Sequence, residues 1–179
     1  MTNEQAQMDQ RIGIDIGNVL TKRDTDIRPF GEDYLNVQPC DGAFEAVTIL
    51  AEIAGPSNIF IISKCSLENQ KKSLEWLEYK NFFSLTGVRQ EHVYFCLKRS
   101  DKRTIAENLQ LNYFVDDRWT VLTHLLTLDS IRKMYLFCPV PEEKEAFMKG
   151  YTGEQIMFVE SWEEIVDDLK SLINSYTDR

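Results

Sequence analysis

Short apolar runs alternate with longer amphipathic segments along the chain, and this alternation is the feature that most constrains the fold. Such a pattern is typical of βα units arranged around a parallel sheet. It predicts six short strands, at residues 11–16, 59–62, 93–96, 113–115, 134–137 and 156–159. We therefore expect an α/β protein, a Rossmann-like three-layer α/β/α sandwich whose parallel sheet has five to six strands.

The segments between the apolar runs have helical spacing and recognisable ends. The first helix is predicted to begin after Asp41, as its N-cap, and to reach Ala54, where Gly55 and Pro56 stop it. Capping and stop signals place the other helices from Cys65 or Ser66 to about Lys80, at 101–109 with Ser100 as cap, around 119–126, at 141–149 closed by Gly150, and after the capping box Ser161–Glu164.

Charge and hydropathy exclude several classes of protein. The chain has 20 basic and 29 acidic residues, a net charge of −9 and a pI near 4.8, which argues against nonspecific binding to nucleic acid or to an anionic membrane. The apolar runs are far shorter than the ~20 residues of a membrane helix. The four cysteines have no CxxC spacing, so we expect reduced thiols in a cytoplasmic protein.

The domain organisation expected from the sequence is simple. Residues 1–10 are polar and are expected to form a flexible N-terminal arm, and residues 11–179 a single domain. The interval between Asp15 and Ser63 contains a predicted helix and strand, and a polar loop makes up the rest.

Polar side chains follow the predicted strands where a parallel sheet binds its ligands, beyond the carboxyl ends of the strands. Asp15 ends the first predicted strand, and Ser63 ends the second. Asp116 and Asp117 end the fourth, and Lys102 lies at the start of the helix before that strand. Clustered carboxylates resist ionising together unless a cation lies among them, and Mg²⁺ commonly binds one or two carboxylates plus a substrate phosphate. The set predicts a magnesium site for phosphoryl transfer.

The ordered motifs Asp15-x-Gly17-Asn18, Ser63, Lys102 and Asp116-Asp117 resemble the four motifs of the haloacid dehalogenase superfamily. The resemblance extends over residues 12–137. It implies a haloacid dehalogenase-like domain with Mg²⁺-dependent phosphatase activity. Many relatives carry a large inserted cap domain, for which the polar loop between Asp15 and Ser63 is too short, so we expect the capless type. An open site of this kind suits a bulky or macromolecular substrate, or a partner that supplies a lid.

The resemblance also implies a role for each matching residue. Asp15 would be the nucleophile and a Mg²⁺ ligand, and the carbonyl of Gly17 a further ligand. Asp117, with Asp116 beside it, would be the acidic Mg²⁺ ligand. Ser63 and Lys102 would hold the transferred phosphoryl group.

The first motif departs from the family pattern at Gly17, where the phosphatases usually carry the Asp that serves as general acid and base. A subgroup of similar phosphatases carries the same Gly-Asn pair. Asp24 or Asp26, just after the first motif, could supply the missing carboxylate. Undiminished turnover of an Asp24→Asn, Asp26→Asn double variant would contradict this hypothesis.

Each of these residues also has a structural interpretation. Asp15 could be a turn residue, Ser63 a cap, and Lys102 an exposed helix residue, with Lys98 or Lys64 in its place at the site. Asp116 and Asp117 could cap the following helix, where negative charge is favoured, and Arg118 could neutralise them without a metal.

Three other protein classes share part of the pattern. Residues 13–17 also resemble the first phosphate motif of sugar kinases and actin-like ATPases, but those proteins need two duplicated domains. Receiver domains combine the same residue types in the reverse order. The serious alternative is a non-catalytic relative that binds a phosphorylated ligand or a protein. We expect instead a phosphohydrolase for a phosphate monoester such as a nucleotide or sugar phosphate; the sequence does not reveal the oligomeric state.

Overall fold

Six parallel strands form one sheet in the computed structural model, which describes residues 10–23 and 30–177. They are β1 (Ile12–Ile14), β2 (Ile59–Lys64), β3 (Val93–Cys96), β4 (Tyr113–Asp116), β5 (Lys133–Phe137) and β6 (Ile156–Val159). The strand order is β3-β2-β1-β4-β5-β6, and every neighbouring pair is parallel. The chain order reverses at β1, which pairs with both β2 and β4, so the switch point lies there.

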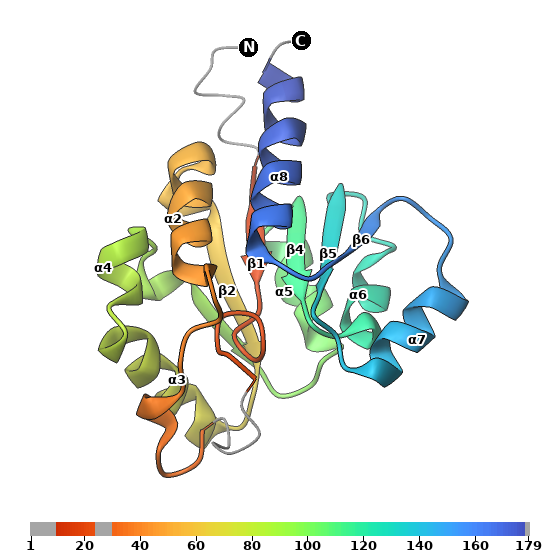
Figure 1. Ribbon diagram of the computed structural model, residues 1–179. Helices are drawn as coiled ribbons and strands as arrows, with labels where there is room; N and C mark the ends of the chain where they lie inside the picture. The colour runs from red at the N-terminus through yellow and green to blue at the C-terminus, as the bar shows by residue number, and fades with distance from the viewer. Residues whose placement is uncertain (1–9, 24–29, 178–179) are drawn as a thin grey trace.

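Helices cover both faces of this sheet (Figure 1). One face packs against α2 (Ala43–Ala54), α3 (Leu67–Tyr79), α4 (Phe82–Thr86) and α8 (Trp162–Thr177). The other packs against α5 (Asp101–Asn108), α6 (Trp119–Leu125) and α7 (Pro141–Gly150). Successive side chains of a strand point to opposite faces, so Ile61 joins the first core and Ile62 the second. The predicted three-layer α/β/α sandwich is confirmed.

Several predicted boundaries were wrong by a few residues. β1 ends at Ile14, because the backbone turns where Val19, Leu20 and Thr21 donate hydrogen bonds to the carbonyl of Ile16. β2 continues to Lys64 and β4 to Asp116, so Ser63 and Asp116 lie within their strands. The small helix α4 had no clear sequence signal.

Helix ends were predicted with mixed success. The capping box of α8 is confirmed, with Ser161 Oγ accepting from the amide of Glu164. Ser66, rather than Cys65, caps α3. Asp41 does not cap α2, because Gly42 takes that position in a left-handed conformation and the Asp41 carboxylate pairs with Lys22. Ser100 occupies the N-cap of α5 but makes no side-chain cap bond, and Gly150 is the last residue of α7.

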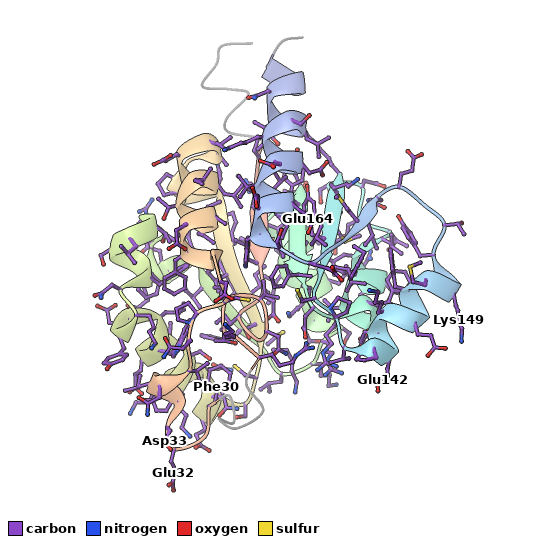
Figure 2. The ribbon with its side chains drawn as sticks, viewed as in Figure 1. Phe30, Glu32, Asp33, Glu142, Lys149 and Glu164 are labelled. Atoms are coloured by element: carbon purple, nitrogen blue, oxygen red, sulfur yellow. The ribbon has the colours of Figure 1, made fainter. Side chains whose placement is uncertain are left out.

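The connection from β1 to α2 is fixed against the rest of the domain by two buried tryptophans. Trp162 Nε1 donates to the carbonyl of Val19 at 3.1 Å, and Trp76 Nε1 to that of Val37 at 2.9 Å. The described part of this connection contains the 3₁₀ helix Tyr34–Asn36 and an isolated antiparallel bridge between Thr21 and Pro39. Phe30, Glu32 and Asp33 of this connection lie on the same side of the molecule (Figure 2). The domain boundary at residue 10 remains a prediction, because residues 1–9 lie outside the described part.

Two further findings concern the cysteines and the length of the helices. All four cysteines are free. Among the residues described, no helix has the length and apolar content needed to cross a bilayer.

Candidate active site

The carboxyl ends of β1, β2 and β4 bring the predicted site residues together. The amide of Asp15 donates to the carbonyl of Val115 at 3.0 Å, which places Asp15 beside the end of β4. A cavity of about 180 Å³ lies at this edge, and its lining includes Asp15, Gly17, Ser63, Lys102, Asp116 and Asp117. All the residues predicted for the site therefore line one cavity.

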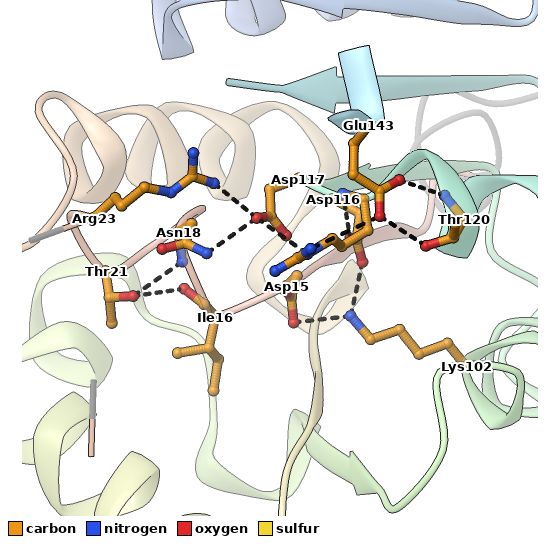
Figure 3. Close-up of polar contacts among 11 residues, drawn as sticks. Asp15, Ile16, Asn18, Thr21, Arg23, Lys102, Asp116, Asp117, Thr120 and Glu143 are labelled. Atoms are coloured by element: carbon orange, nitrogen blue, oxygen red, sulfur yellow. Dashed lines mark hydrogen bonds and ion pairs between the residues drawn. The ribbon is translucent and has the colours of Figure 1, made fainter. Parts of the chain in front are cut away.

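Lys102 lies between two of the carboxylates, and its side chain is buried (Figure 3). Its Nζ is 2.8 Å from Asp15 Oδ1 and 2.7 Å from Asp116 Oδ2. Burial alone would lower the pKa of Lys102, but the charges of Asp116 and Asp15 outweigh burial and raise it. Lys102 is therefore a fixed positive charge beside Asp15.

The two lysines considered as alternatives to Lys102 lie elsewhere. Lys98 is exposed and is not part of the cavity lining, and its backbone amide donates to Asp101. Lys64 lines the cavity, but its side chain is exposed at the end of β2. Among these three lysines, contact with Asp15 belongs to Lys102.

Asp116 and Asp117 are bound in different ways. Asp116 uses both oxygens, since Oδ2 meets Lys102 and Oδ1 accepts from the amide of Arg118 at 2.9 Å. Asp117 Oδ2 accepts from Asn18 Nδ2 and from Arg23, each at 3.0 Å, while its Oδ1 takes no part in these contacts (Figure 3). Asp117 thus has an oxygen outside this network.

Arg118 does not neutralise the carboxylate pair alone. Its Nε is 3.6 Å from Asp117 Oδ2, and its other end lies 3.7 Å from Glu143 Oε1. Glu143, in the first turn of α7, also accepts from the amide and hydroxyl of Thr120. The charge of Arg118 is shared between Asp117 and Glu143.

Sequence reasoning missed the functional context of several residues. Asn18 and Arg23 both bind Asp117, and their position just after Asp15 was a signal that could have identified them. Glu143, Arg99 and Phe30 reach the site or its border from other elements, with no such signal. Asp24 and Asp26, the proposed substitutes for the missing general acid, lie outside the described residues.

Comparison with known proteins gives structural relatives only. No protein-family model matches this chain, and no curated protein does. A protein described as a haloacid dehalogenase-like hydrolase from Burkholderia xenovorans LB400 has a TM-score of 0.56 at 15% identity, over 80% of this chain and 63% of that chain. D,D-heptose 1,7-bisphosphate phosphatase from Burkholderia thailandensis has a TM-score of 0.60 at 17% identity, over 90% of this chain and 99% of that chain.

The chain has the haloacid dehalogenase-like fold. The resemblance seen in the four short motifs is thereby confirmed for the architecture. This chain spans less than two thirds of the first relative and nearly the full length of the second.

The carboxylates of this site fit a hard divalent cation. Oxygen atoms of Asp15, Asp116 and Asp117 lie within 4.8 Å of one another, and all three residues are buried. Burial, followed by the neighbouring carboxylates, raises the pKa of Asp116 to about 7 against the opposing effect of Lys102. Burial and Asp15 also raise the pKa of Asp117. The cluster therefore has less positive charge than its carboxylates need, and an oxygen-binding cation such as Mg²⁺ would supply it.

The raised pKa of Asp116 predicts a pH-dependent stability. Because Asp116 holds its proton more tightly in the folded state, folding takes up a proton between its ordinary pKa of 3.8 and about 7. The free energy of unfolding should therefore fall as pH rises through this window, by at most about 1.4 kcal/mol per pH unit from this group. Urea unfolding in EDTA at a series of pH values measures the slope.

The matched variants are Asp116→Asn, which should flatten the slope, and Asp129→Asn as control. Asp129 is exposed and precedes β5, at the opposite edge of the sheet, so its variant should keep the wild-type slope. An identical slope in wild type and Asp116→Asn would show that Asp116 does not titrate in this window.

Proposed function

We propose that this protein is a Mg²⁺-dependent phosphohydrolase that cleaves a phosphate monoester through an aspartyl-phosphate on Asp15. The observation that carries the proposal is the contact of buried Lys102 with Asp15, beside two further buried carboxylates in one cavity. A buried ammonium in contact with the Asp15 carboxylate fixes the position of that side chain, as a nucleophile requires.

The two oxygens of Asp15 have different surroundings. Oδ1 faces Lys102, whereas Oδ2 lies towards Gly17. A Cβ added to Gly17 would lie 3.9 Å from Oδ2 and would make no closer contact, so the space beside Oδ2 is open. We assign the attack on phosphorus to Oδ2. A bond forms between Oδ2 and phosphorus, the ester P–O bond breaks, and the leaving oxygen takes a proton; water then cleaves the acyl phosphate and regenerates Asp15.

The residues around Asp15 would stabilise the transferring group. Ser63, buried at the end of β2, would donate its hydroxyl to a phosphoryl oxygen, and Lys102 would offset the charge that develops. Asp15, Asp117 and the carbonyl of Gly17 would hold Mg²⁺, with Asp116 beside them. When bound, Mg²⁺ would neutralise charge on the phosphoryl oxygens.

Position 17 carries no carboxylate that could protonate the leaving group. We assign this step to Asp24 or Asp26, because they follow the first motif in the same connection.

The substrate class is proposed from the charge and openness of the site. Sugar phosphates and nucleotides are the first candidates, and the similar structure from Burkholderia thailandensis is that of a phosphatase for a heptose bisphosphate. The acidic chain disfavours nucleic acid and anionic membranes as partners. We propose that the protein acts in the cytoplasm.

A binding module is the second candidate, and Gly17 is the observation that favours it, since the usual general acid is missing there. The two functions differ in their need for Asp15. An enzyme loses turnover when Asp15 becomes Asn, whereas a binding module can retain its ligand.

The experiment is phosphate release from a panel of phosphate esters, with Mg²⁺ and with EDTA. Asp15→Asn removes the nucleophile and should lower turnover by at least about a thousandfold. EDTA should abolish release from the wild type. Asp41→Asn is the matched control, because Asp41 is exposed and pairs only with Lys22 among the described residues.

Two results would count against this proposal. Release that persists in Asp15→Asn would remove Asp15 as nucleophile. No release from any ester, together with retained binding of a phosphate ester, would favour the binding module.

A further inference from the structure

Two exposed cations at the mouth of the cavity have no counter-charge within the described part of the chain. Lys64 ends β2 and Arg99 precedes α5, and both line the cavity. Neither side chain makes a hydrogen bond or ion pair with a described residue. They are separate from the Lys102 contact described above.

Other lysines and arginines of this acidic protein pair with a carboxylate. They are Lys22, Arg23, Lys71, Lys72, Arg89, Lys102, Arg118, Lys144 and Lys149. Lys64 and Arg99 are unpaired among the described residues and line the same cavity, so together they form a local positive site.

The other two cations of the lining are already engaged. Lys102 contacts Asp15 and Asp116, and Arg118 lies between Asp117 and Glu143. Lys64 and Arg99 are therefore the cations of this cavity lining that remain for a further anion.

We infer that the substrate carries a second phosphate, held by Lys64 and Arg99 outside the cavity that receives the transferred phosphoryl group. The inference rests on the proposed function and specifies its substrate as a small bisphosphorylated molecule. The cavity is small, at about 180 Å³. The rest of the substrate must then lie at the mouth, where arginine binds phosphate through paired N–H groups and lysine as a point charge.

The test compares esters that differ by one phosphate. We would measure kcat/KM in Mg²⁺ for glucose 1,6-bisphosphate against glucose 6-phosphate, and for adenosine 3′,5′-bisphosphate against adenosine 5′-monophosphate. For at least one pair, the wild type should prefer the bisphosphate by about tenfold or more. A Lys64→Gln, Arg99→Gln double variant should lower that preference about ten- to a hundredfold, as expected for lost charge-assisted hydrogen bonds.

Lys98→Gln is the matched control, because it removes a neighbouring exposed charge that does not line the cavity. Its preference should equal that of the wild type. Equal kcat/KM for both members of each pair, or an unchanged preference in the double variant, would overturn the inference while leaving the phosphatase intact. A strong preference for an oligonucleotide over all four esters would overturn it as well.

Failure of the proposed function gives a different result. If the wild type hydrolyses no ester, calorimetric titration with the two bisphosphates in Mg²⁺ still tests the second site. Weaker binding by the double variant than by Lys98→Gln would support the inference without catalysis, and equal binding would overturn it.

Discussion

The buried ammonium of Lys102 is the interaction on which the rest of the site depends. Three carboxylates removed from water would repel one another, and the cost of their desolvation is large unless cations lie among them. Lys102 contacts Asp15 and Asp116 at once, and it comes from a different segment of the chain than either carboxylate. The position of α5 against the sheet therefore determines whether Asp15 is held in place.

The fold supplies this arrangement through its topology. In a parallel sheet every strand ends at the same edge, and the reversal of chain order at β1 leaves a crevice there. Asp15 directly follows β1, Asp116 ends the neighbouring strand β4, and Ser63 lies near the end of β2 on the other side of β1. The two apolar cores on the faces of the sheet keep this edge rigid, so that polar groups are placed by strands rather than by free loops.

Much of the fold and part of the site could be predicted from the sequence. The alternation of strand and helix patterns predicted all six strands, because each strand is a short apolar run, and β1, β2, β4 and β5 are almost entirely buried. The site residues Asp15, Ser63 and Lys102 could be predicted because each lies at a strand end or helix start. The left-handed Gly42 that displaces Asp41 from its capping role, and the approach of Glu143 to Arg118, depend on tertiary contacts that no local pattern contains.

The central claim is that Asp15 carries the phosphoryl group during turnover, and acid-quenched turnover followed by mass spectrometry tests it most directly. The account predicts a phosphorylated peptide that contains Asp15, formed by the wild type with a hydrolysed ester and Mg²⁺, and absent from the Asp15→Asn variant. Two results would contradict the claim. One is hydrolysis during which Ser63, and not Asp15, is phosphorylated. The other is hydrolysis with no phosphorylated protein under conditions in which an acyl phosphate survives.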